Sequence, residues 1–90
     1  MKAVILDEHG STDGFKVTEI PPPTALPGNV VLKVCASSVN PVDCKIRSGM
    51  LAGIGPSLPG VLHGDVAGII SEVGEGVEAF EVGDEVYGCV

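Results

Sequence analysis

The sequence has no tryptophan, one tyrosine and two phenylalanines. No apolar stretch approaches the roughly 20 residues that cross a bilayer. The opening stretch "MKAVILDEHG" has one lysine and a short apolar run that acids interrupt too early for a signal peptide. We therefore expect a soluble, cytoplasmic protein with no membrane partner.

Basic residues are missing from the second half of the chain. No lysine or arginine follows Arg47, whereas seven acidic residues do, and the formal net charge is -7 at pH 7. Because binding to phosphates or anionic lipids depends on clustered positive charge, nucleic acid is not an expected partner.

Cysteine is also scarce. The three cysteines are odd in number and form no C-x-x-C pair, so neither a closed disulfide framework nor a cysteine metal site is indicated. We expect buried or half-buried thiols in a reducing compartment.

The residues that are plentiful favour a small β-rich domain with one hydrophobic core. Thirteen glycines and seven prolines cut 90 residues into short pieces rich in Val, Ile and Leu. A hairpin (residues 2–7 and 15–20) and an exposed proline-rich connector (21–29) are predicted first. A strand over 29–40 should turn Val30, Leu32, Val34 and Ala36 toward the core. Strands at 66–74 and 84–90 follow, joined by turns at Gly74, Gly76 and Gly83, which together suggest a barrel or sandwich.

A short helix interrupts the strands at "NPVDCKIRSG". Asn40 is a good N-cap, Pro41 suits the first helical position, and Asp43 in the first turn complements the helix dipole. Basic side chains fall in the last turn, and Gly49 can end the helix.

Three stretches in this order, "SSVNPVDCKIRSG", "LPGVLHGDVAGIISEVGEGV" and "FEVGDEVYG", resemble the start of the medium-chain dehydrogenase/reductase superfamily. The resemblance implies a mainly β fold, a GroES-like partly open β-barrel with one short helix. Residues 1–90 would be an incomplete N-terminal catalytic domain of a larger α/β enzyme. The NADPH-binding Rossmann domain would be absent, which agrees with the missing glycine fingerprint and the apolar end "VYGCV".

Within this superfamily the zinc alcohol dehydrogenases carry a ligand cysteine where Asn40 stands, and a Gly-His-Glu motif whose histidine binds the catalytic zinc. Here the corresponding stretch is His63-Gly64-Asp65, so Gly64 falls at the ligand position. A shift of one residue along a strand turns a side chain to the opposite face, so His63 is not a simple substitute. With both ligands replaced, no metal site is expected, and the resemblance is to the zinc-independent quinone oxidoreductase branch.

The same resemblance suggests roles for particular residues. Asn40, as N-cap, would also lie in the cleft near the nicotinamide and the substrate carbonyl. Lys45 replaces a tyrosine found in some quinone reductases, and either polarises a carbonyl or is simply solvated. Asp43 is interpreted as structural.

The second motif gives the remaining candidates. His63 and Asp65 are placed at the rim of the substrate cleft, Asp65 pairing with a basic side chain or closing the barrel mouth. Gly64 and Gly68 are interpreted as structural, permitting turns and close backbone approach.

The whole protein is then expected to be a homodimer or homo-oligomer that uses NADPH, without zinc, to reduce quinones or activated C=C or carbonyl substrates. The 90 residues alone should be inactive, and their unpaired strand edges should lead to self-association or marginal stability. Two alternatives stay open: a fragment of a zinc-dependent alcohol dehydrogenase, and a stand-alone GroES-like binding or assembly module.

Overall fold

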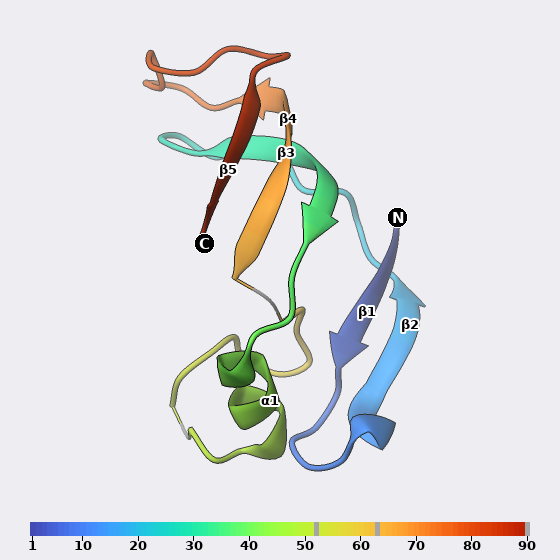
Figure 1. Cartoon of the computed structure of the whole chain (residues 1–90). Coiled ribbons are helices and arrows are strands. Elements are labelled where there is room, and N and C mark those ends of the chain that lie inside the picture. Colours follow the sequence, from blue (N-terminus) through green and yellow to red (C-terminus); the bar gives the residue numbers. More distant parts are fainter. Residues whose placement is uncertain (52, 63, 90) are drawn as a thin grey trace. The chain divides into compact units, whose positions relative to one another are not determined.

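The computed structural model describes residues 1–51, 53–62 and 64–89, and within them the fold is mainly β with one short helix, as predicted. In chain order the elements are β1 (Lys2–Leu6), the 3-10 helix η1 (Thr12–Gly14), β2 (Phe15–Glu19), β3 (Val30–Ser37), α1 (Pro41–Ser48), β4 (Asp65–Val73) and β5 (Glu85–Cys89) (Figure 1). The described strands form a two-stranded sheet, β1–β2, and a three-stranded sheet, β3–β4–β5, and do not close a barrel.

The chain groups into two compact units, not around the single core expected from its length. The first unit contains Met1–Pro21 and Val39–His63, and the second contains Pro22–Ser38 and Gly64–Val90. Leu6 and Leu62 are buried in the first unit, and Ile70 is buried in the second. The two sheets lie in different units, and each unit has its own buried apolar side chains.

The predicted hairpin is confirmed in the first unit. β1 and β2 pair antiparallel from Lys2↔Glu19 to Leu6↔Phe15, and η1 supplies the turn between them. A Cβ at Gly14 would lie 2.6 Å from the Glu8 carbonyl oxygen, so the tight return needs glycine. Leu6, which is fully buried, also exchanges backbone hydrogen bonds with Gly60. The hairpin is thereby tied to the loop that precedes β4.

The predicted helix is confirmed at both ends. Asn40 is the N-cap in an extended conformation, Pro41 is the first helical residue, and Gly49 ends α1 in the left-handed region with φ of 86°. The Arg47 guanidinium donates to the Gly10 carbonyl, and the Gly10 amide donates to the Arg47 carbonyl at 2.9 Å. The end of α1 is therefore fixed to the turn of the hairpin.

The expected alternation along β3 is only partly correct. β3 and β4 pair antiparallel, but the register shifts between Val31 and Leu32 and again between Val34 and Ala36. The first shift leaves out Ser71 of β4 and the second leaves out Cys35 of β3, so the strict two-residue alternation of β3 is broken at Cys35. Val34, expected in the core, is 57% exposed, and Ile70 of the central strand supplies the buried side chain.

The connector and the turns behave as predicted. Pro21, Pro22 and Pro23 are exposed, and the connector is held by the Ala25 amide, which donates to the Glu72 carboxylate at 2.8 Å. Between β4 and β5, Gly76 and Gly83 have positive φ. These residues allow β5 to return antiparallel to β4.

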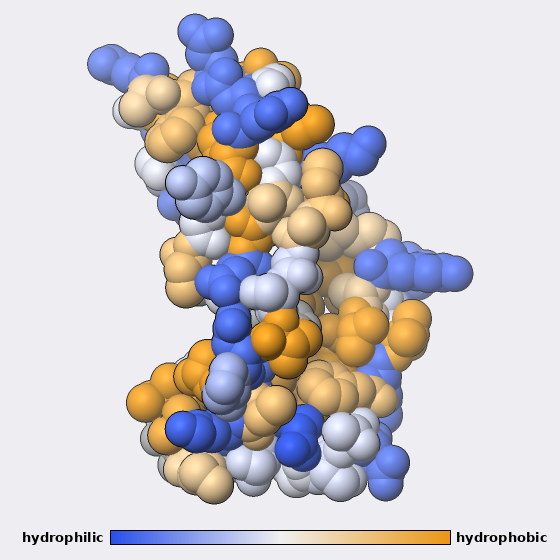
Figure 2. Space-filling view, in the orientation of Figure 1, coloured by the Kyte–Doolittle hydropathy of each residue, from blue (hydrophilic) through white to orange (hydrophobic). Residues whose placement is uncertain are grey.

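The predicted burial of the cysteines is wrong. Cys35, Cys44 and Cys89 are all free thiols on the surface. Cys35 is skipped by the β3–β4 register and Cys89 lies in the edge strand β5, so neither points into a packed interior. Large apolar side chains are also exposed, as the hydrophobic patches among hydrophilic residues in Figure 2 show. None of the described helices is long and apolar enough to cross a membrane.

Candidate functional site

The first candidate residues, Asn40 and Asp43, lie at the N-terminus of α1 and form two hydrogen bonds with each other. The backbone amide of Asn40 donates to the Asp43 carboxylate at 2.8 Å, and the backbone amide of Asp43 donates to the backbone carbonyl of Asn40 at 3.0 Å. Asn40 is half-buried, whereas Asp43 is only 6% exposed. The structure therefore holds Asn40 at the start of α1, and the carboxylate that accepts its backbone hydrogen bond is buried.

Lys45 lies further along the same helix, and its side chain is exposed. At 100° per residue it is about 140° around the helix axis from position 40. The two positions are therefore on different sides of α1. This geometry supports Lys45 less than Asn40 as a residue that contacts the substrate carbonyl. Its predicted role stays a prediction.

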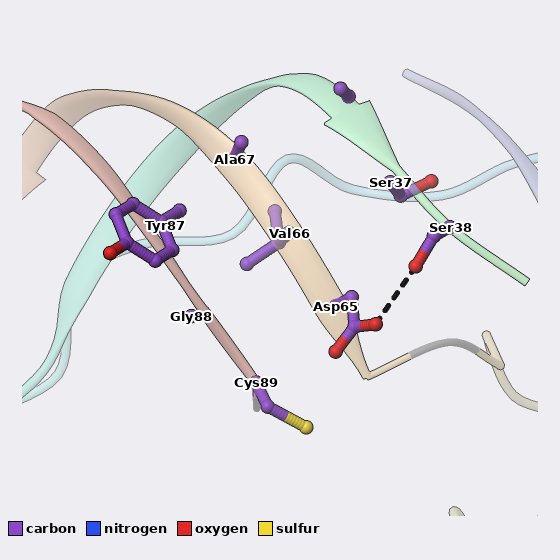
Figure 3. A pocket seen from close by; sticks show the side chains of 9 residues that line it. Ser37, Ser38, Asp65, Val66, Ala67, Tyr87, Gly88 and Cys89 are labelled. Carbon is purple, nitrogen blue, oxygen red and sulfur yellow. Dashed lines mark hydrogen bonds between the residues drawn. The ribbon is translucent and has the colours of Figure 1, made fainter. Parts of the chain in front are cut away.

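The second set of candidates lies where β3 ends and β4 begins. Asp65 is half-buried, and its carboxylate accepts a hydrogen bond from the Ser38 hydroxyl at 2.8 Å (Figure 3). The bond ties the ends of two paired strands together, just beyond the Ser37↔Val66 pair. The observed partner is a hydroxyl group, and the predicted pairing of Asp65 with a basic side chain stays a prediction.

Asp65 and Ser38 border an open depression of about 440 Å³ within the second unit. Its wall is mostly apolar or small and comes from the ends of all three strands: Ala36, Ser37, Val66, Ala67, Tyr87, Gly88 and Cys89 (Figure 3). Asp65 pairs with Cys89 and Ala67 with Tyr87, so these four side chains share one face of the sheet. Tyr87 is 90% exposed above that face.

The remaining predicted residues have different outcomes. His63 lies outside the described residues. Gly64 is half-buried, and Gly68 is buried in β4, where a Cβ would lie 2.2 Å from the Lys33 carbonyl oxygen. Gly68 thus allows the close strand approach for which glycine was predicted.

Sequence reasoning missed Ser38, Tyr87 and Cys89. A signal existed for Ser38, since a hydroxyl residue two positions before the helix cap stands at a predicted strand end. No sequence pattern indicated that β5 would bring Tyr87 and Cys89 beside Asp65, because that contact depends on strand pairing. Across residues 1–51, 53–62 and 64–89, no group of three or more His, Cys, Asp or Glu side chains is placed to hold a metal ion.

Comparison with known protein families identifies a match over most of the chain. The chain belongs to the alcohol dehydrogenase GroES-like domain family, which matches residues 26–90. The superfamily resemblance stated from the three motifs is therefore confirmed.

Similar proteins include two oxidoreductases. A chloroplastic NADPH-dependent alkenal/one oxidoreductase of Arabidopsis thaliana is 38% identical over 100% of this chain and 24% of its own length. The quinone oxidoreductase of Rattus norvegicus is 41% identical over 97% of this chain and 26% of its own.

Among solved structures, Escherichia coli quinone oxidoreductase complexed with NADPH matches with a TM-score of 0.87 and 31% identity, covering 97% of this chain and 26% of that chain. The chain therefore spans about a quarter of the length of each of these relatives. It corresponds to the N-terminal part of larger enzymes.

Proposed function

We propose that this chain is the N-terminal catalytic-domain segment of a longer oxidoreductase that transfers hydride from NADPH to quinones or activated C=C bonds without zinc. The names of the similar proteins support the reaction class, and the NADPH complex of the bacterial relative supports the cofactor. In this proposal the cofactor domain lies outside residues 1–90, and the 90 residues alone do not turn over substrate.

One observation carries the zinc-independent part of the proposal. The residue at the expected metal-ligand position is an amide, Asn40, held as a helix N-cap with φ of -118° and ψ of 163°. At the second expected position Gly64 has no side chain. Catalytic zinc needs three protein ligands and an open position, and a carboxamide and a glycine do not fit that donor set.

The residues of α1 do fit a carbonyl substrate beside a nicotinamide. NADPH, when bound, supplies the hydride. The carboxamide of Asn40 offers N–H donors that can stabilise the negative charge developing on a quinone or enone oxygen. Because Asn40 stands at a helix N-terminus, the helix dipole adds to this stabilisation. The proton that completes the reduction comes from solvent or from a group outside this segment.

The test uses the complete reading frame that contains this segment. We expect the purified enzyme to oxidise NADPH with simple quinones or enones, and to keep that activity after treatment with a strong chelator. Elemental analysis should find no stoichiometric zinc. One tightly held zinc per subunit, lost together with activity on chelation, would overturn the proposal in favour of a zinc alcohol dehydrogenase. Binding of a partner without any NADPH oxidation would favour a GroES-like module.

A further inference from the structure

Asp43 is the one charged side chain that is buried within the described residues, at 6% exposure. Its position, third in α1, is one where an acid often caps the helix while remaining in water. Burying a carboxylate is costly unless hydrogen bonds compensate it. Helix capping alone explains the choice of an acid here, but not its burial.

The bonds around Asp43 show what the buried carboxylate holds. It accepts a hydrogen bond from the backbone amide of Asn40 at 2.8 Å, a charge-assisted bond that is stronger than a neutral one. The Asp43 amide returns a bond of 3.0 Å to the Asn40 carbonyl. The two peptide groups that flank the Asn40 Cα are therefore both fixed, and with them the direction of its Cα–Cβ bond.

We propose that Asp43 is a positioning residue for Asn40. Its buried carboxylate holds the backbone amide of Asn40, and this bond directs the side-chain carboxamide of Asn40 toward the substrate oxygen. This inference rests on the proposed function, in which Asn40 touches the substrate. A displacement of about 1 Å in such a group can cost a hundredfold in rate. Asp43 itself touches neither substrate nor cofactor in this proposal.

The test is a double-mutant cycle in the complete enzyme with Asn40→Ala and Asp43→Asn. Asp43→Asn is nearly isosteric and removes the charge but leaves an oxygen acceptor. We expect it to lower kcat about tenfold with little change in the KM for NADPH. If Asp43 acts through Asn40, then Asp43→Asn should have almost no further effect on kcat in the Asn40→Ala background.

The matched control is Asp13→Asn, which changes the exposed first-turn acid of η1. It should leave kcat unchanged. Asp43→Glu, which keeps the charge on a longer stem, should recover part of the rate. Because Asp43→Asn could also lower the folded fraction, kcat is referred to folded enzyme, measured by circular dichroism. In the wild type, the backbone amide proton of Asn40 should resonate downfield because it is bonded to a carboxylate, and Asp43→Asn should reverse that shift.

Two results would overturn the positioning role while leaving the oxidoreductase assignment intact. Additive effects on kcat would show that Asp43 acts independently of Asn40. If the Asn40→Ala enzyme had the wild-type rate, the Asn40 carboxamide would have no role in the reaction, and Asp43 could not act through it. A wild-type enzyme without NADPH oxidation would instead refute the proposed function, and the positioning role with it.

Discussion

Substituting Gly68 tests the closest backbone approach in the β3–β4–β5 sheet. Gly68 lies in the central strand, opposite Val34 of β3 and Val86 of β5. A Cβ at this position would lie 2.2 Å from the Lys33 carbonyl oxygen, whereas real Cβ contacts almost never fall below 3.0 Å. The Gly68→Ala variant therefore requires β3 to move by about 0.8 Å, and the obstacle is backbone, not a flexible side chain.

The magnitude follows from the cost of overpacking. Inserting a methyl group into a packed site costs about 1–3 kcal/mol, and a backbone obstacle places Gly68→Ala at the upper end. A loss of about 3 kcal/mol would lower Tm by more than about 10 °C.

Gly88→Ala is the matched control, because Gly88 lies in the adjacent strand β5 and a Cβ there would meet nothing within 4 Å. This variant should be neutral or more stable by about 0.4–1 kcal/mol, since alanine restricts the unfolded chain. Urea unfolding of the 90-residue chain, followed by far-UV circular dichroism, measures both variants. Equal midpoints for Gly68→Ala and Gly88→Ala would refute the reasoning from strand approach.

Three further outcomes are expected for the same chain. The hydrogen bond and charge of Asp7 raise the pKa of Lys16 above its ordinary value of 10.5. The stability that this exposed pair contributes is therefore fully present below pH 10.5 and is lost as the pH rises through the raised pKa. Lys16→Met should therefore flatten the fall in the unfolding midpoint above pH 10, and an unchanged slope would contradict this. Glu72→Ala removes the acceptor of the Ala25 backbone amide, so it should lower the free energy of unfolding by about 0.5–1.5 kcal/mol and speed hydrogen exchange at Ala25. Glu72→Gln keeps an oxygen acceptor and should keep most of the protection from exchange. A thiol reagent should titrate all three cysteines without denaturant, because all are exposed; slow reaction of any one would contradict its placement.

The parts of this structure that the sequence predicted best are those determined by neighbouring residues. The bounds of α1 follow from Asn40, Pro41 and Gly49, because caps act through hydrogen bonds and φ preferences within one turn. The hairpin likewise follows from two short apolar runs around a glycine-bracketed turn. These features need no knowledge of the rest of the fold.

What could not be predicted depends on contacts between distant residues. The bulges in β3 and β4 appear only when the two strands are paired, and Val34, next to the bulge at Cys35, is exposed. The Ser38–Asp65 bond joins residues 27 positions apart. The burial of Asp43 is also tertiary, because Asp43 occupies a position that is solvated in an isolated helix. Pattern reasoning identified Asp43 and Asp65 as notable residues, but the burial of Asp43 and the Ser38–Asp65 bond became visible only in the folded chain.

The start of α1 shows how one residue can serve both the fold and the proposed chemistry. In the zinc alcohol dehydrogenases of this superfamily, a cysteine at the position of Asn40 supplies a thiolate ligand to the metal. Asparagine is among the best N-cap residues and has no thiol group, so the residue that caps α1 does not supply a thiolate ligand. A cysteine restored at position 40 would weaken the cap without rebuilding the donor set, since Gly64 still lacks a side chain. The proposal of a zinc-independent reaction therefore rests on two positions, and changing one of them alone does not test the other.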